Sequence, residues 1–214
     1  MAKTITVSGV GTANNKPDYI IISMNLSSKN MSYEGAVDSA NRRIELLQNA
    51  LSGIGFAKDD LKTQDFTVNS EFDNIQENGQ YKRVFSGYSC TYYLKLSFDF
   101  SAEFLAKTLN AIINSKADTE FSISFTVKDP EKISEQLLIS AAENARKKAE
   151  ILCKALMKTL GELISIDYNL NGINAVSPSN YRVMRAAVPM AAVPEFTPED
   201  IHSDTRVTFV WEIV

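Results

Sequence analysis

The chain has 214 residues, of which 44% are hydrophobic and 22% are charged, with 22 lysines and arginines against 26 aspartates and glutamates. A chain of this length and composition buries about 70% of its unfolded surface, so we expect it to fold without a disulfide or a metal ion. The net charge of −4 argues against a dedicated nucleic-acid binder, which needs a strongly positive field. A single histidine excludes any site that needs two.

The N-terminal residues show no apolar stretch of the kind that marks a secretory signal, and the longest apolar run is too short for a membrane span. Cys90 and Cys153 fall on different predicted elements, which favours small buried side chains over a disulfide or a redox pair. We therefore expect a cytoplasmic protein without a transmembrane segment, or a periplasmic or exported one if a signal peptide has been removed.

Alternating apolar and polar residues predict strands at 4–10 and 18–28. A helix is predicted over 33–51, because its apolar residues recur at alternating spacings of four and three. Ser32 is the expected N-cap of this helix, and Gly53 or Gly55 the expected end.

Two further strands are predicted at 61–72 and 85–98. The polar stretch between them contains Asn78-Gly79, a dipeptide typical of β-hairpins, so we expect the two strands to pair antiparallel. A shorter helix capped by Ser101 is expected over 102–114, followed by a strand over 121–127.

The sequence Asp129-Pro130-Glu131 is typical of a helix start, and the predicted helix runs to about Leu160, before Gly161. Strands are expected at 163–170 and 205–214. Between them lies a connection with four prolines, 171–203, whose length is uncommon in a compact domain, and we expect it to be a flexible arm.

The arm contains an apolar, weakly basic run that we interpret as a self-association surface, because methionine adapts to irregular partners and arginine is favoured at interfaces. The alternative is a loop that folds over its own domain or stays disordered. The candidate self-association residues are Tyr181, Arg182, Met184, Arg185 and Met190.

The order of these elements predicts an α+β fold with mostly antiparallel sheets, packed with two long helices and one shorter helix. A long Pro/Met/Ala-rich arm precedes the last strand. The chain is expected to form a single domain over 1–214, or two intertwined α/β subdomains, with the flexible arm at 171–203.

No motif predicts a reaction. Gly9 and Gly11 form Gly-x-Gly, but Asn14 occupies the third position of a dinucleotide fingerprint, so we interpret the glycines as easing a strand end or a bulge. His202 is expected on the surface beside the arm. The basic cluster at 146–148 is interpreted as a salt-bridged, solvent-facing helix surface, with binding to an anionic surface as the alternative. We predict no catalytic, cofactor-binding or metal-binding residues and no cofactor.

In their order along the whole chain, the motifs resemble the SIMPL domain family, also called DUF541. The segments that carry the resemblance are Ile5-Thr6-Val7-Ser8-Gly9-Val10-Gly11, Lys16-Pro17-Asp18, Asp60-Leu61-Lys62-Thr63, Gly87-Tyr88, the Ala/Lys/Arg helix at 141–149, Leu160-Gly161-Glu162-Leu163 and Thr197-Pro198-Glu199-Asp200-Ile201. Bacterial members of the family are largely described as exported or periplasmic, some as oligomeric assemblies and some as associated with oxidative stress. The resemblance implies no catalytic residues.

We therefore expect a non-enzymatic, self-associating protein with a structural or oxidative-stress-related role, forming a homo-oligomer and binding no nucleic acid. The alternative is a small-molecule binding module that uses a cleft between the two subdomains, its ligand unknown. A third hypothesis is an enzyme built on spatially paired carboxylates.

Overall fold

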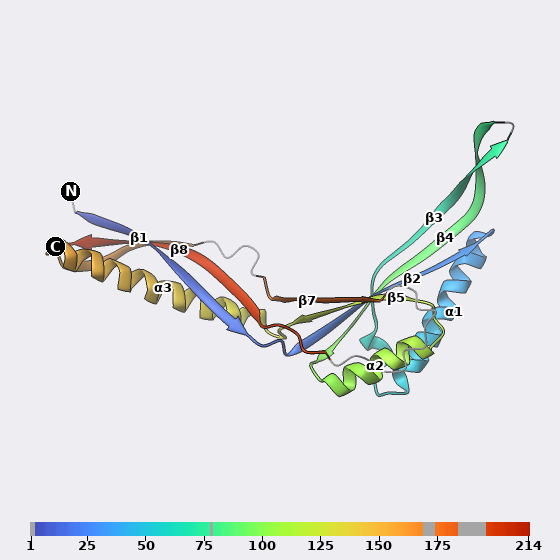
Figure 1. The fold of residues 1–214 in the computed structure, drawn as a ribbon, viewed down its shortest axis with the longest axis horizontal. Coiled ribbons are helices and arrows are strands. Elements are labelled where there is room, and N and C mark those ends of the chain that lie inside the picture. Colours follow the sequence, from blue (N-terminus) through green and yellow to red (C-terminus); the bar gives the residue numbers. More distant parts are fainter. Residues whose placement is uncertain (1–2, 78, 169–173, 184–195) are drawn as a thin grey trace. The chain divides into compact units, whose positions relative to one another are not determined.

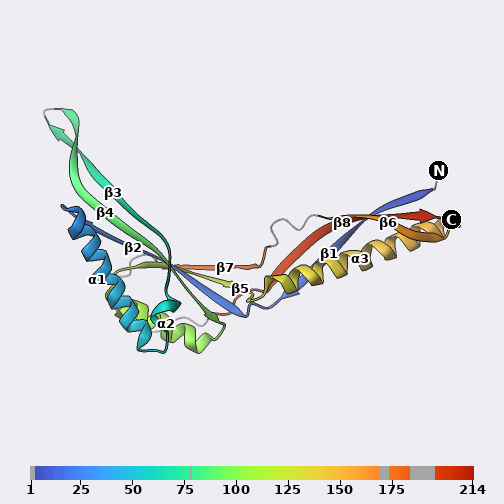
Figure 2. The ribbon, with the colours of Figure 1, turned by 180° about the vertical axis from the view of Figure 1, so that it is seen from behind.

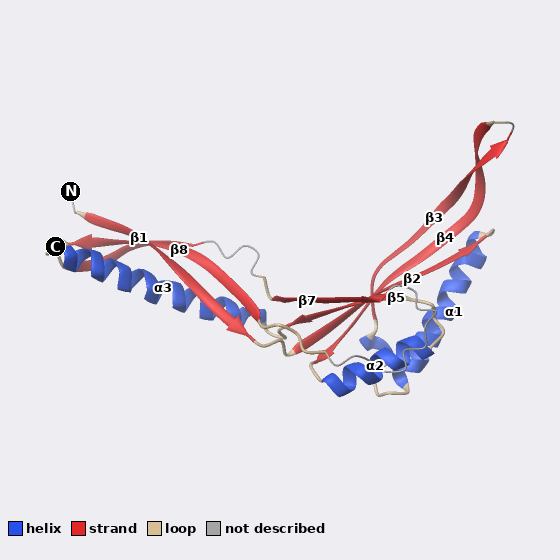
Figure 3. Ribbon diagram, viewed as in Figure 1, coloured by secondary structure: helices blue, strands red, loops and turns tan. Residues whose placement is uncertain are grey.

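The computed structural model describes residues 3–77, 79–168, 174–183 and 196–214, which form an α+β fold with two antiparallel sheets (Figures 1 and 3). This confirms the predicted fold class. The elements are β1 (Thr4–Asn15), β2 (Tyr19–Asn30), α1 (Tyr33–Ser52), a short 3-10 helix (Lys58–Asp60), β3 (Lys62–Glu77), β4 (Gln80–Asp99), α2 (Ala102–Asn114), β5 (Glu120–Thr126), α3 (Pro130–Ala155), β6 (Leu160–Tyr168), β7 (Val176–Val183) and β8 (Ile201–Ile213).

Contacts between Cα atoms divide the chain into two compact units. The first consists of Met1–Asp18, Phe125–Pro178 and Pro198–Val214, and the second of Tyr19–Ser124 and Ser179–Thr197. The strand order is β1-β8-β6 in one sheet and β3-β4-β2-β5-β7 in the other. None of the described helices is long and apolar enough to cross a membrane.

In the first unit, α3 packs along one face of the three-stranded sheet, chiefly against β1 and β8, as Figure 2 also shows from behind. Its buried side is built from small residues, so the helix lies close to the sheet. Large apolar side chains of β8 fill the remaining space. The shared core consists of Val7, Ala141, Ala145, Ala149, Val207, Phe209 and Trp211.

Gly9 and Gly11 are the positions where α3 comes closest to β1. Both are buried in the middle of the strand, and they pair with β8 in an uninterrupted register. A methyl group built at Gly11 would collide with the carbonyl oxygen of Leu137, and one at Gly9 with that of Ala141. The interpretation as a strand end or bulge is therefore wrong, because it is close approach of the helix that requires glycine here.

Polar side chains of α3 bond to β1, one of the two edge strands of the sheet. The Asn144 side-chain oxygen accepts from the Val10 amide at 3.0 Å, and the Ser140 hydroxyl accepts from the Thr12 amide at 3.2 Å. Lys148 donates to the backbone oxygen of Ser8 at 3.2 Å. Because residues four apart lie above one another on a helix, 140, 144 and 148 form one ladder along the strand. We call these three residues the β1 ladder.

In the second unit, alternate residues of β2 are buried against the helices, as the predicted strand pattern required. α1 packs on β2 and β4, and α2 packs on α1. Phe104 of α2 is anchored to the sheet by Phe98 of β4, with ring centroids 5.3 Å apart. The predicted caps are confirmed, since Ser32 and Ser101 accept from backbone amides at 3.1 and 3.2 Å.

The last helix is shorter than predicted. α3 ends at Ala155, and Met157 then adopts a left-handed φ of 51°. The Lys158 amide donates to the Cys153 oxygen at 2.8 Å, and the Met157 amide to the Lys154 oxygen at 3.2 Å. This is the Schellman ending that glycine usually provides, so Gly161 was a misleading stop signal.

The segment predicted as a flexible arm contains a strand. Val176–Val183 forms β7 at the edge of the five-stranded sheet, and β8 already begins at Ile201 rather than at Thr205. The sequence pattern did not indicate this strand, because it contains Pro178 and proline is typical of loops. Proline is tolerated in a sheet mainly at an edge, where β7 lies. The hairpin of β3 and β4 has the predicted antiparallel pairing, and its strands extend further toward Gly79 than predicted.

Replacing Gly11 by alanine should lower the free energy of unfolding by about 1–3 kcal/mol, the usual cost of overpacking, because the Leu137 carbonyl lies where the methyl group must go. Gly53→Ala is the control, since Gly53 has a helical φ of −63° and its nearest atom lies 3.4 Å from the added carbon. That change should stay within about 1 kcal/mol. Urea unfolding followed by circular dichroism measures both, and equal midpoints would contradict the close approach.

Candidate functional site

A pocket of about 260 Å³ opens on the face of the five-stranded sheet opposite the helices. Buried apolar residues of β2, such as Ile22 and Met24, face the helices, so the alternate residues Ser23 and Asn25 face the pocket. We call it the sheet pocket. It is lined by Ser23, Met24, Asn25, Gln64, Tyr93, Leu94, Glu120, Phe121, Ser122 and Arg182.

The strand register explains how distant residues meet at the sheet pocket. Asn25 lies directly opposite Tyr93, whose side chain is 43% exposed. On the next strand, Thr63 pairs with Leu94 and Asp65 pairs with Tyr93, which leaves Gln64 as the extra residue of a β-bulge. Bulges redirect a side chain at the point where they occur, and this one lies at the pocket.

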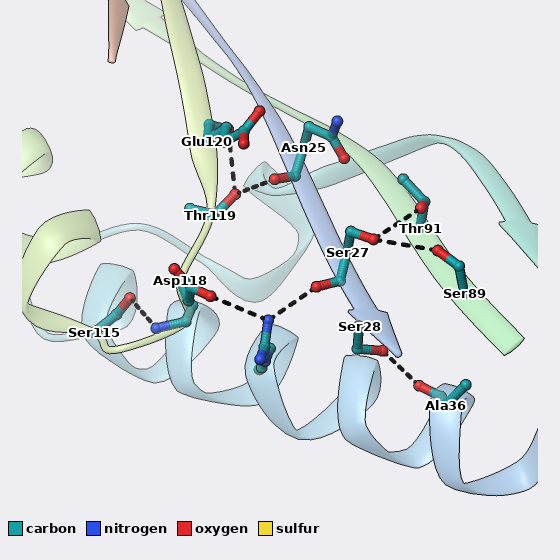
Figure 4. A network of polar contacts seen from close by, with 12 residues as sticks. Asn25, Ser27, Ser28, Ala36, Ser89, Thr91, Ser115, Asp118, Thr119 and Glu120 are labelled. Atoms are coloured by element: carbon teal, nitrogen blue, oxygen red, sulfur yellow. Dashed lines mark hydrogen bonds and ion pairs between the residues drawn. The ribbon is translucent and has the colours of Figure 1, made fainter. Parts of the chain in front are cut away.

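A pinned loop places Glu120 beside Asn25. Asp118 adopts a left-handed φ of 50° and forms an ion pair with Arg43 at 3.6 Å. Arg43 also donates to the backbone oxygen of Ser27 at 2.9 Å. The Thr119 hydroxyl donates to the Asn25 backbone oxygen at 3.0 Å. Figure 4 shows the side chains of Asn25 and Glu120 both pointing away from α1.

Asn25 carries an unsatisfied polar atom. Its side-chain oxygen is buried and has no hydrogen-bond partner among the described residues. Ser27, two residues along the same strand face, is by contrast fully engaged, since it accepts from the Thr91 hydroxyl at 3.3 Å and lies 3.5 Å from the Ser89 hydroxyl. A buried acceptor without a partner usually costs about 1–3 kcal/mol, so Asn25 is a polar group of the sheet pocket that the fold leaves unsatisfied.

Two of the predicted self-association residues lie on β7. The Tyr181 ring packs edge-on against Phe196, with centroids 4.8 Å apart, and Arg182 reaches the sheet pocket. Met184, Arg185 and Met190 lie outside the described residues, so their role stays a prediction.

A second surface lies in the first unit, between α3 and β6. This groove of about 480 Å³ has apolar walls and a charged rim, where Arg146 and Glu150 form an ion pair at 3.0 Å. We call it the β6 groove. It is lined by Ala142, Arg146, Glu150, Leu160, Gly161, Leu163, Ile166, Phe209 and Trp211.

The β6 groove exists because α3 covers β1 and β8 but barely touches β6. Leu163 and Ile166 pair with β8 residues that face the helix, and yet they are 47% and 50% exposed. Within the described chain, β6 also has a sheet neighbour on one side only. Long edge strands with exposed apolar side chains are sites of association.

The two cysteines are buried and free, as predicted. Cys90 lies in β4 of the second unit and Cys153 in α3 of the first, and burial raises the pKa of the Cys90 thiol. His202 is exposed on β8, opposite Asn14. No group of three or more potential metal ligands occurs within the described ranges.

Sequence reasoning missed Asn25, Gln64 and Glu120. The polar alternation of the predicted strand at 18–28 was the available signal for Asn25, because it marks a sheet face that no helix covers. Nothing in the sequence marks the bulge that turns Gln64 toward the pocket.

A family model, SIMPL, described as a protein of unknown function (DUF541), matches residues 5–211 of the chain. No curated protein matches this sequence.

Asn25→Val should raise the free energy of unfolding by up to about 1 kcal/mol, because it removes an unpaired buried acceptor and valine suits a strand. Ser27→Val on the same face should lower it by about 0.5–1.5 kcal/mol, because Thr91 loses its acceptor. Urea unfolding compares the two. A loss of stability in Asn25→Val as large as in Ser27→Val would show that the Asn25 oxygen is satisfied.

Proposed function

The chain belongs to the SIMPL (DUF541) family, and from this premise we propose that it is a non-enzymatic, self-associating protein with a structural or oxidative-stress-related role. The observation that carries the proposal is the exposed apolar side of β6. The oxidative-stress part follows from the family resemblance and is assigned to no residue.

The partner at the β6 groove is a second copy of this chain. Its rim carries a cation and an anion side by side, Arg146 and Glu150, and such a surface is complementary to itself across a two-fold axis. Leu163 and Ile166 would supply the apolar centre, where most of the binding energy of an interface arises.

The two edges of the three-stranded sheet favour this arrangement. The β1 ladder bonds the Val10 and Thr12 amides and the Ser8 oxygen of β1, so the middle of that edge is less open to a second strand. At the other edge, β6 presents Ile164 and Tyr168, which are 51% and 59% exposed. The asymmetry gives one preferred contact, which closes as a dimer before any further contact forms.

Light scattering coupled to size exclusion tests the proposal. The wild-type chain should have a mass above the 23.7 kDa of a monomer. Ile166→Lys should shift the mass toward that of the monomer, because its oligomer should dissociate at a protein concentration at least about tenfold higher than that of the wild type. The charge would lie in the apolar centre of the contact, where it has no partner.

Ile75→Lys is the matched control, because Ile75 is 46% exposed and lies on β3, in the five-stranded sheet of the second unit and not in the sheet that forms the β6 groove. It should leave the mass unchanged. A chain that lacks residues 184–193 tests the predicted arm separately. A wild-type monomer at high concentration would contradict self-association, and an Ile166→Lys chain that keeps the wild-type mass would exclude the β6 groove.

A further inference from the structure

We propose that the sheet pocket binds a free α-amino acid, with Arg182 recognising its carboxylate and Glu120 its ammonium group. This ligand site is separate from the β6 groove, because all its residues lie in the second unit and those of the groove lie in the first.

The two charged residues of the pocket have opposite sign and lie on neighbouring strands. Glu120 begins β5 and Arg182 lies in β7, next to it in the sheet order. Adjacent strands are about 4.8 Å apart. An α-amino acid carries its ammonium and carboxylate on one carbon atom, so two opposite charges on neighbouring strands suit it. Arginine also matches a carboxylate with two parallel N–H donors.

The rest of the pocket is neutral and comes from β2, β4 and β3, together with Phe121 and Ser122 of β5. It offers the Asn25 side-chain oxygen, which lacks a donor, together with the amide of Gln64 and the exposed ring of Tyr93. A ligand side chain with an N–H group would satisfy this oxygen once the Asn25 side chain turns toward the pocket. Glutamine carries such a group on a neutral side chain, so we take it as the probe among the simple amino acids.

The size of the pocket limits the ligand to one small molecule. Its volume of about 260 Å³ lies just below the roughly 300–1,000 Å³ of sites for drug-sized ligands. A peptide would carry its terminal charges on different residues and would not match the adjacent pair. A neutral sugar would use the hydroxyls of Ser23 and Ser122 but would need neither charge.

Isothermal titration of the full chain with L-glutamine tests the proposal. We expect saturable binding, with N-acetyl-L-glutamine and L-glutamine amide at least about tenfold weaker, because each has lost one charged group. D-glucose should not compete. No binding of L-glutamine at millimolar concentration, or equal binding of glucose, would overturn the assignment.

Two variants link each charge to its residue. Arg182→Gln should weaken glutamine binding by about 10–100-fold and bind glutamine and its amide alike. Glu120→Gln should instead bind glutamine and its N-acetyl derivative alike. Arg42→Gln, an exposed change on α1 outside the pocket, is the control and should bind as the wild type does.

Asn25→Val adds a readout that a loss of folding would not produce. It should weaken glutamine binding while the chain becomes more resistant to urea, because the unpaired oxygen serves the ligand and not the fold. Variants of Arg182 and Glu120 that keep wild-type affinity and selectivity would disprove the charge assignment.

Discussion

The close packing of α3 against β1 determines how the first unit is built. Gly9 and Gly11 leave room for the helix backbone, and the alanines of α3 face the strand, so the helix lies over β1 and β8. One helix cannot also cover β6, and the apolar residues of β6 therefore remain exposed. The same packing brings the β1 ladder onto the outer strand. One edge of the sheet is therefore partly bonded within the chain, while the apolar residues of the other edge are exposed.

The sequence predicted those elements whose periodicity and end signals agree. Ser32 and Ser101 cap their helices as expected, and alternation placed β2 and its buried face correctly. The pattern failed where tertiary contacts override local signals. Pro178 reads as a loop residue but is tolerated in an edge strand, and Met157 takes the left-handed position at which glycine was expected.

The candidate site was less predictable than the fold, because its residues come from five strands that are distant in sequence. Arg182 was singled out from the composition of its segment, although for self-association. Asn25 becomes notable only when its oxygen is seen to lack a partner, and Gln64 only when the bulge is seen. Likewise, the glycines of β1 suggested a bulge until the helix that approaches them was in view.

Amide hydrogen exchange at different protein concentrations tests most directly whether β6, which α3 does not cover, is the contact with a second copy of the chain. We expect that the amides of Leu160–Tyr168 on the edge that does not pair with β8 are protected at high concentration and lose protection on dilution. The Val10 and Thr12 amides should stay protected throughout, because Asn144 and Ser140 bind them within the chain. Exchange in β6 that does not depend on concentration would contradict the account.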